Sequence, residues 1–424
     1  MFDRVESSVL SEQSFIIVGA GLAGARAAEA MRTEGFTGRI ILVAAESEYP
    51  YIRPPLSKEY LAGTAERNSI FVQQPTWYAE NDVEIVPGDP AVTLSPTAHE
   101  LVLGSGQILH FDKLLLATGA SSRRFPGPGV GFPGVHHLRT VEESEQLRDE
   151  LAPGGRSIVI VGAGWIGLEV AAAAKGYGND VVVLGRESVP LEAVVGSEVG
   201  AVFLKLHTDN GVDVRMNTAV TELVGADGIH HVGGVRLSSG EIVAADVVVV
   251  GIGAIPNIQL AEDAGLRLDN GIVVDATFRS SHPDIYAVGD VANVFHPVLG
   301  HPIRIEHWAN AENAGAAAGR SMVGNTSDYD LIPYFYTDQF DLGMEFSGYA
   351  DWMTDATVVF RGNRDERRFI AFWVANSRVV AGMNVNVWDV NETVQKFIRS
   401  GVVVDADRLA DESITLESQL GGTD

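Results

Sequence analysis

Cysteine is absent from all 424 residues of the sequence. Its absence excludes disulfides, thiolate metal sites, iron–sulfur ligation by this chain and every cysteine-based redox mechanism. Long apolar runs are also missing: the longest, residues 158–168, stops at Glu169 and is too short to span a bilayer. The first fourteen residues contain Asp3, Arg4, Glu6 and Glu12 and no apolar core of signal-peptide length. We therefore predict a cytoplasmic protein without a membrane segment.

Basic residues are scarce, with 30 Lys and Arg against 56 Asp and Glu, which gives a net charge of −26. A surface of this sign repels nucleic-acid phosphates and anionic lipid, so neither is expected as a partner. Apolar residues make up 46% and charged residues 20%, which is ordinary for a packed chain and excludes global disorder. The length suggests about three domains at ~150 residues each.

Glycine is plentiful, and its placement is informative. A buried strand over residues 15–18 runs into the turn Gly19-Ala20-Gly21-Leu22-Ala23-Gly24, followed by a helical run and a second strand over 39–43. The same order recurs with a strand over 157–161, the turn Gly162-Ala163-Gly164-Trp165-Ile166-Gly167, a helix, and a strand over 180–184. Such turns allow close backbone approach and present helix N–H groups to a pyrophosphate. One copy could serve packing alone, but two copies in matching contexts predict two dinucleotide sites.

Three further strands end on glycine turns. Two of them close the two units, at Ala117-Thr118-Gly119 and at Gly251-Ile252-Gly253. The third leads into Gly289-Asp290, where an acid could accept hydrogen bonds from sugar hydroxyls beside a helix start. From residue 331 onward, aromatic-rich alternating segments such as 358–360 and 369–374 predict antiparallel strands.

These elements predict an α/β fold with two Rossmann-like dinucleotide-binding domains and a small α+β C-terminal domain. We expect a discontinuous first domain over 1–116 and 250–330, a second inserted over 117–249, and the C-terminal domain over 331–424. The acidic stretch 405–424 is expected to be loosely held. No metal site is predicted, because the pairs His136-His137 and His230-His231 have no accompanying ligand spacing.

Taken together, these motifs resemble the flavoprotein reductases with two dinucleotide domains and a glutathione-reductase-like fold. The stretches Arg53-Pro54-Pro55-Leu56-Ser57-Lys58 and Thr337-Asp338-Gln339-Phe340-Asp341 are similar to the FAD-dependent ferredoxin reductases of bacterial oxygenase systems. This resemblance implies FAD in the first domain and a nicotinamide nucleotide in the second. It also implies hydride transfer from NAD(P)H to the flavin, then single-electron delivery to a [2Fe–2S] ferredoxin that supplies an oxygenase. Without cysteine, the thiol-using relatives are excluded, and the cofactor performs the chemistry.

The resemblance also implies the residues around FAD. Glu46, one position later than the family's usual acid, is the candidate for the adenosine ribose, with a solvated loop acid as the alternative. Val92 could equally be a core valine and Trp308 a packing aromatic. The expected FAD-binding set is Gly19, Gly21, Ala23, Gly24, Glu46, Arg53, Lys58, Val92, Ala117, Thr118, Gly119, Arg139, Asp290 and Trp308.

Lys58 and Glu169 are expected to act at the flavin, and the resemblance puts them together beside its N5 atom. Glu169 stands in an otherwise apolar run from Trp165 to Ala174, which favours burial, and a buried carboxylate is costly unless paired. A helix-surface acid is the alternative. Because hydride transfer depends on positioning, we expect the pair to orient the nicotinamide and tune the flavin rather than to act as a general acid.

The nicotinamide nucleotide is expected at the second glycine turn. The strand 181–184 ends in Gly185-Arg186-Glu187, where many family members place an acid that accepts from the 2′-hydroxyl of NADH. Its absence removes repulsion against a 2′-phosphate that Arg186 could bind, which favours NADPH, while Glu187 keeps NADH open. The expected set is Gly162, Gly164, Trp165, Ile166, Gly167, Gly185, Arg186, Glu187, Gly251, Ile252 and Gly253.

The expected partner is a small acidic [2Fe–2S] ferredoxin. Because this chain is itself acidic, it needs a local basic patch to bind such a partner. Arg361, Arg364, Arg367 and Arg368 form the densest cluster, with a charged hairpin turn as the alternative. Tyr336 is a candidate for covering the flavin, with core packing as the alternative. A monomer or weak dimer is expected. Rival functions are a reductase with another acceptor (rubredoxin, oxygen or quinone) and a signalling flavoprotein resembling apoptosis-inducing factor.

Overall fold

The computed structural model describes residues 13–226 and 231–421. Within these ranges the chain forms two compact units. Unit 1 takes the described residues up to Ile52, together with Phe71–Ala120 and Pro256–Asp330, and unit 2 takes Arg53–Ile70, Ser121–Ile255 and the described residues from Leu331 onward. The chain passes between the units within β8 (Ala120–Ser122) and β17 (Ala254–Pro256). The three-part division from the sequence stays a prediction.

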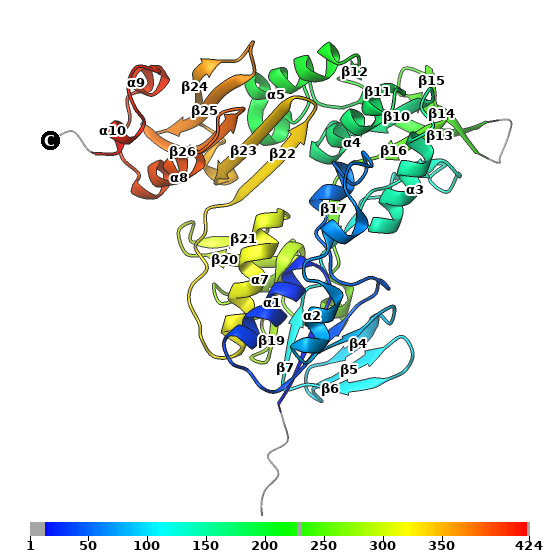
Figure 1. Cartoon of the computed structure of the whole chain (residues 1–424), viewed down its shortest axis with the longest axis vertical. Helices are drawn as coiled ribbons and strands as arrows, with labels where there is room; N and C mark the ends of the chain where they lie inside the picture. The colour runs from blue at the N-terminus through cyan, green and yellow to red at the C-terminus, as the bar shows by residue number, and fades with distance from the viewer. Residues whose placement is uncertain (1–12, 227–230, 422–424) are drawn as a thin grey trace, which may run out of the picture. The chain divides into compact units, whose positions relative to one another are not determined.

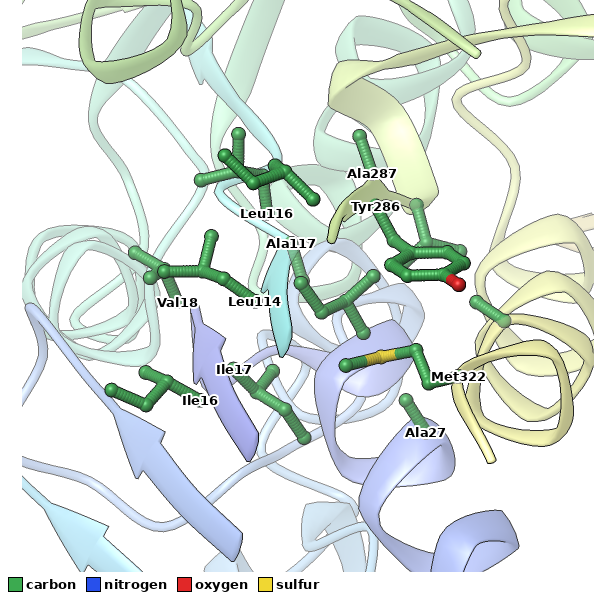
Figure 2. Close-up of a cluster of buried hydrophobic side chains, with 14 of the residues drawn as sticks. Ile16, Ile17, Val18, Ala27, Leu114, Leu116, Ala117, Tyr286, Ala287 and Met322 are labelled. Atoms are coloured by element: carbon green, nitrogen blue, oxygen red, sulfur yellow. The ribbon is translucent and has the colours of Figure 1, made fainter. Parts of the chain in front are cut away.

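Unit 1 is built on a five-stranded parallel sheet in the order β19-β7-β1-β2-β3. The strands are β1 (Ser14–Val18), β2 (Arg39–Val43), β3 (Val83–Val86), β7 (Lys113–Leu116) and β19 (Ile285–Ala287). Their nearly continuous apolar sequences are what a sheet buried on both faces requires. Figure 2 shows Ile16, Ile17 and Leu114 from neighbouring strands among the buried side chains of this core.

Two helices pack closely on each other in unit 1, α1 (Leu22–Thr33) and α7 (Trp308–Met322) (Figure 1). A Cβ at Gly315 or Gly319 would lie 2.4 Å from the carbonyl oxygen of Ala23 or Ala27, so only glycine permits this approach. The remaining elements of unit 1 are α2 (Pro75–Glu80), α6 (Gln259–Asp263), η3 (Gly289–Val291), the antiparallel sheet β4 (Ala91–Ser95), β5 (Glu100–Leu103) and β6 (Ile108–His110), and the sheet β18 (Ile272–Val274), β20 (Ala292–His296) and β21 (His301–Ile303).

Unit 2 repeats the parallel plan in the order β12-β11-β10-β16-β9. Its strands are β9 (Val135–His136), β10 (Ser157–Val161), β11 (Asp180–Leu184), β12 (Asp213–Arg215) and β16 (Val247–Val250), with helices α3 (Val141–Leu151), α4 (Trp165–Gly176) and α5 (Glu192–Asp209). An antiparallel sheet of β13 (Val220–Ala226), β14 (His231–Leu237) and β15 (Ile242–Ala244) adjoins it, and short 3-10 turns η1 (Pro54–Ser57) and η2 (Arg67–Ile70) precede it in the chain. Both predicted βαβ units are confirmed.

The C-terminal part of unit 2 is an antiparallel sheet in the order β22-β23-β26-β25-β24 (Figure 1). It comprises β22 (Tyr334–Gln339), β23 (Leu342–Gly348), β24 (Thr357–Asn363), β25 (Arg368–Ala375) and β26 (Arg378–Val385), followed by α8 (Asn391–Ser400), α9 (Ala406–Ala410) and α10 (Glu417–Leu420), with η4 (Ala350–Trp352) inserted. The predicted antiparallel strands are confirmed. Across the described part of the chain, no helix is long and apolar enough to cross a membrane.

The prediction that residues 405–424 are loosely held is wrong for the described residues 405–421. Leu409 and Leu416 are buried. The Arg361 guanidinium also donates to four backbone carbonyls of this segment, those of Leu409, Asp411, Glu412 and Ile414. Arg361 thus holds the backbone of this segment in place, a contact that the acidic composition of the segment does not reveal.

Candidate functional site

The first glycine turn lies between β1 and α1 at the carboxyl end of the unit 1 sheet. Gly19 has φ +114°, and a Cβ there would lie 2.2 Å from the carbonyl oxygen of Ala117 at the end of β7. A Cβ at Gly24 would lie 2.2 Å from the carbonyl oxygen of Gly19. At Gly21, by contrast, no atom lies within 4 Å of the Cβ position. The first and third glycines serve the fold, while the second leaves room for a ligand to reach the backbone.

The second glycine turn, between β10 and α4 in unit 2, has the same steric pattern. Gly162 has φ +116°, and its Cβ would lie 2.1 Å from the carbonyl oxygen of Gly251 at the end of β16. Gly167 would meet the Gly162 carbonyl oxygen at 2.2 Å, and Gly164 again has nothing within 4 Å. The two copies therefore match in geometry as well as in sequence.

Neither helix after these turns has a side-chain cap. Gly21 and Gly164 stand at the N-cap positions of α1 and α4 in extended conformation. Neither has a side-chain oxygen that could accept from the free N–H groups of the first turn. Uncapped N–H groups and the positive end of the helix dipole form an anion site. Both turns can thus hold a dinucleotide pyrophosphate.

The residues predicted around the first turn occupy several elements of unit 1. Glu46 follows β2 and accepts a hydrogen bond from the Tyr51 hydroxyl. Val92, in β4, is 52% exposed, so the alternative of a core valine is wrong. Asp290 lies in η3, where its carbonyl accepts from Arg304, and Trp308 begins α7. Buried Ala117 follows the β7 strand, which ends at Leu116. The Thr118 hydroxyl donates to the Asn257 carbonyl and the Asn257 amide donates to the Thr118 carbonyl, which fixes the turn through Gly119.

In unit 2, a 3-10 turn presents Lys58. Pro54 and Pro55 begin η1 with their fixed φ angles, and the Lys58 N–H donates to the Pro55 carbonyl. The Lys58 ammonium lies 2.9 Å from Oε1 of Glu169 on α4, and the two side chains are 9% and 5% exposed. The predicted burial of Glu169 and its pairing with Lys58 are confirmed, so the helix-surface alternative is wrong.

Two hydroxyl groups complete the surroundings of Glu169. The Ser57 hydroxyl donates to Oε2, and the Thr337 hydroxyl, from β22, donates to Oε1 at 2.5 Å. With Lys58, three donors hold a carboxylate that would otherwise be buried at high cost. Sequence reasoning assigned no role to Ser57 or Thr337, although both stand in the two stretches that carry the resemblance.

The aromatic residues of β22 divide between two faces. Phe335 is buried against Trp165 and Phe346, so it packs the core. Tyr336 points to the other face, with its ring centroid 5.5 Å from the Lys58 ammonium, and burial raises its pKa to about 12. Burial also raises the pKa of neighbouring Asp338, an effect that Lys58 opposes. A neutral phenol and a cation therefore share this face of unit 2.

Arg53 and Arg139, both predicted at the flavin, are joined within unit 2. Thr140 begins α3 with a capping box, in which its hydroxyl accepts from the Glu143 N–H and the Glu143 carboxylate accepts from Thr140. The same carboxylate accepts from the Arg139 N–H, and the Arg53 guanidinium donates to the Arg139 carbonyl. The cap thereby fixes the backbone at Arg139.

The end of β11 lies against the second glycine turn. The Gly162 N–H donates to the carbonyl of Leu184, and a Cβ at Gly185 would lie 3.0 Å from the Cβ of Ala163. Arg186 and Glu187 follow and are exposed. Among residues 13–226 and 231–421, Arg186 makes no ion pair, so its guanidinium is available to a ligand at this turn. Trp165 and Ile166 are the first two residues of α4, and the Ile166 side chain is exposed. Ile252 and Gly253 follow Gly251 after β16.

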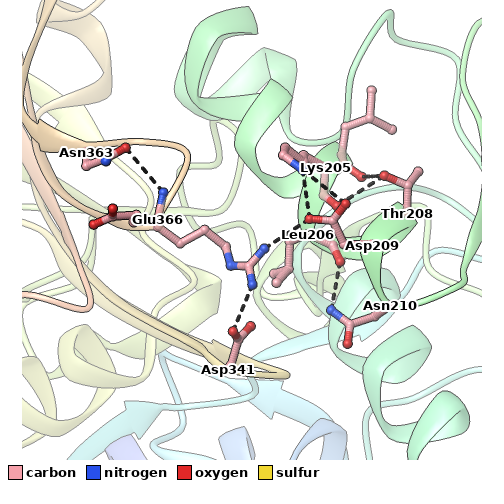
Figure 3. Close-up of polar contacts among 10 residues, drawn as sticks. Lys205, Leu206, Thr208, Asp209, Asn210, Asp341, Asn363 and Glu366 are labelled. Atoms are coloured by element: carbon pink, nitrogen blue, oxygen red, sulfur yellow. Dashed lines mark hydrogen bonds and ion pairs between the residues drawn. The ribbon is translucent and has the colours of Figure 1, made fainter.

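The arginine cluster proposed for docking is partly used inside unit 2. Arg361 holds the C-terminal segment, and Arg367 pairs with Asp209 on α5 at 3.2 Å and with Asp341 at 2.8 Å. Figure 3 shows these two carboxylates facing the same guanidinium. Arg364 and Arg368 stay exposed. Arg361 in β24 and Arg367 in the turn before β25 thus both make contacts within unit 2, and the docking role of the cluster stays a prediction.

The fold and the two glycine turns define a class, the α/β oxidoreductases that hold two dinucleotides. The family model for pyridine nucleotide-disulphide oxidoreductases matches residues 13–315, and the model described as reductase C-terminal matches residues 334–420. The chain belongs to the pyridine nucleotide-disulphide oxidoreductase family and is an oxidoreductase. Because it has no cysteine, it lacks the disulfide after which the family is named.

Three relatives illustrate the similarity. Rhodocoxin reductase of Rhodococcus erythropolis is 35% identical over 95% of this chain and 93% of its own length. The ferredoxin–NAD(+) reductase component of the anthranilate 1,2-dioxygenase system of Burkholderia cepacia is 36% identical over 97% of this chain and 100% of its own. The structure of the covalent putidaredoxin reductase–putidaredoxin complex matches with a TM-score of 0.92 and 33% identity, covering 96% and 98% of the two chains. The predicted family resemblance and fold class are confirmed.

Proposed function

We propose that this chain is an FAD-containing NAD(P)H:ferredoxin reductase that supplies electrons to an oxygenase. The observation that carries the proposal is the matched pair of glycine turns, each with an uncapped helix start and an open second glycine. Unit 1 would hold FAD at the turn of residues 19–24, and unit 2 would hold the nicotinamide nucleotide at the turn of residues 162–167. Relatives named as ferredoxin reductase components support the ferredoxin acceptor.

The chemistry that bound FAD would supply is the uptake of a hydride equivalent from the nucleotide and the release of single electrons. The chain's own residues bind and orient the reactants. Lys58 and Glu169 are proposed to face the nicotinamide amide and the flavin, with the ammonium as donor and the carboxylate as acceptor. Tyr336 shares this face and is proposed to cover the flavin. Because positioning drives such a transfer, no proton need leave either residue of the pair.

The nucleotide preference is proposed to be for NADPH. Arg186 is exposed, free of any carboxylate among the described residues, and next to the turn that would hold the pyrophosphate. An arginine there can donate two charge-assisted hydrogen bonds to a 2′-phosphate. Glu187 is also exposed and is the residue through which NADH could still be used.

The acceptor is proposed to be a small acidic [2Fe–2S] ferredoxin. The test is cytochrome c reduction by the purified holoprotein, with and without such a ferredoxin, using NADPH and NADH in parallel. A large ferredoxin-dependent rate is expected. If the nucleotide bleaches the flavin but several different ferredoxins add nothing, the acceptor assignment is wrong and oxygen, quinone or rubredoxin must be tried instead.

Arg186→Ala tests the nucleotide preference. We expect kcat/KM for NADPH to fall about tenfold or more, since a charge-assisted contact is lost, while the NADH value changes less than about twofold. Arg408→Ala, which removes an exposed arginine of α9, controls for the change in net charge. An unchanged NADPH to NADH ratio in Arg186→Ala would refute the role of this residue.

A further inference from the structure

A chain of hydrogen bonds continues inward from Glu169 and is not used by the function described above. Thr337 and Gln339 on β22 and His207 on α5 are all buried, and we call these three residues the Glu169 donor chain. The Thr337 hydroxyl lies 2.5 Å from Glu169, Gln339 Nε2 lies 3.3 Å from the Thr337 hydroxyl, and His207 Nε2 lies 2.9 Å from Gln339 Oε1. All belong to unit 2.

The chemistry of these groups fixes the direction of every bond. An ionised carboxylate can only accept, so the single proton of the Thr337 hydroxyl points to Glu169, and its oxygen accepts from the Gln339 amide. The Gln339 carbonyl oxygen is then left for His207, whose Nε2 must carry the proton. Each member thus donates toward Glu169.

His207 is held in this one form. Its Nδ1 is buried and has no hydrogen-bond partner among the described residues, so a second proton on the ring would find no acceptor. Burial accordingly lowers the pKa of His207, although the bond to Gln339 opposes this shift. A neutral histidine in a single tautomer therefore stands at the end of the Glu169 donor chain.

The segment α5 consists of two helical stretches joined at Gly196, whose φ of +78° is not helical, and both stretches lie next to residues of the proposed chemistry. Glu192 begins this helix and accepts from Ser188, just after the proposed 2′-phosphate residue Arg186. At the other end, His207 bonds Gln339 in the interior, and Asp209 pairs with Arg367 and Lys205 at the surface (Figure 3). The C-terminal sheet is thus anchored to the second helical stretch of α5, which lies after the break at Gly196.

We infer that Thr337, Gln339 and His207 are positioning residues for reduction by the nicotinamide nucleotide, because they hold the Glu169 carboxylate in the orientation that directs the Lys58 ammonium. The inference rests on the proposed function of the Lys58–Glu169 pair. Ser57 orients Oε2, whereas Thr337 and Lys58 share Oε1. Loss of the Thr337 hydroxyl would leave one donor on each oxygen, Ser57 on Oε2 and Lys58 on Oε1, and so hold the carboxylate less firmly.

The test is anaerobic stopped-flow mixing of the holoenzyme with NADPH or NADH, following flavin absorbance. Thr337→Val should lower the limiting rate constant by about fivefold or more, because a hydrogen bond to a charged group is lost. The half-saturating nucleotide concentration should change less than about twofold, since the glycine turn supplies most of the binding. Thr337→Ser should restore the rate. Thr357→Val, an exposed position in β24, is the matched control and should behave as wild type.

Two further variants separate positioning from folding. In a Glu169→Gln background, Thr337→Val should change the rate by less than about twofold, because its effect acts through the carboxylate. Gln339→Met removes the amide one step away and should slow reduction by about twofold or more, but less than Thr337→Val does. It decides the question if Thr337→Val yields no holoenzyme.

The inference is overturned if Thr337→Val or Gln339→Met reduces the flavin at the wild-type rate. It is equally overturned if Thr337→Ser is as slow as Thr337→Val, or if the Thr337→Val effect persists in full without Glu169. Flavin reduction needs no ferredoxin. A protein that is reduced by nucleotide but passes nothing to ferredoxin would therefore refute the proposed function and leave this test intact.

Discussion

Removal of the Lys58 ammonium should destabilise unit 2 strongly. In Lys58→Met, Glu169 keeps its burial and loses its counterion. Breaking one side of a buried ion pair costs about 3–5 kcal/mol. The Ser57 and Thr337 hydroxyls still donate to the carboxylate, so we place the loss near the lower end, ~3 kcal/mol. For a unit of this size each kcal/mol lowers Tm by ~2–4 °C, so a fall of ~6–12 °C is expected.

The assay is thermal unfolding of the holoprotein, followed by far-UV circular dichroism and by flavin fluorescence. Lys396→Met is the matched control, because Lys396 forms an exposed i,i+4 pair with Glu392 on α8, and it should lower Tm by at most ~2 °C. The double variant Lys58→Met with Glu169→Leu should recover part of the loss, since an apolar pair tolerates burial. The reasoning fails if Lys58→Met unfolds within 2 °C of the wild type, as the control does.

Two other predictions use contrasts within the chain. Gly162→Ala should lower Tm by ~4 °C or more, because its Cβ would collide with the Gly251 carbonyl at a φ of +116°, whereas Gly164→Ala should keep Tm and weaken nucleotide binding; equal Tm values would contradict this. Burial lowers the pKa of His307 to about 4, an effect that Asp290 opposes. Because the unfolded chain takes up this proton at a higher pH than the folded chain, the free energy of unfolding falls as pH drops from about 6.5 toward 4. His307→Gln should flatten that decline in Tm measured across the same range, and a slope equal to wild type would count against the assignment.

The parallel sheets and both glycine turns could be predicted because their determinants are local. The strand residues are apolar on both faces, and each glycine's requirement is set by atoms in the turn itself or in the strand beside it. The burial of Glu169 could likewise be predicted from the sequence, because its neighbours from Trp165 to Ala174 are all apolar. Local patterns of this kind need no knowledge of tertiary register.

The partners of Glu169 could not be derived from local pattern. Ser57 precedes it by 112 residues and Thr337 follows it by 168, so their meeting depends on how η1, α4 and β22 pack. The same holds for Arg361, whose four carbonyl acceptors lie beyond position 408. Its neighbours in sequence suggested a solvent-facing basic patch, while its contacts make it a structural residue.

The helices after the two glycine turns differ at one matched position, and the difference separates a residue that the fold needs from one that it does not. Two residues after the third glycine, α1 carries Arg26 and α4 carries Glu169. Arg26 keeps solvent contact and pairs with Glu29 and Glu312 at 2.6 and 2.8 Å. Glu169 is sealed with Lys58, and a buried ion pair of this kind stabilises a fold little or not at all compared with apolar residues of similar volume. The other buried positions of this helix are Gly, Leu, Val and Ala, so an apolar residue would also fit at 169, and the buried charge there supports the proposed role of the Lys58–Glu169 pair.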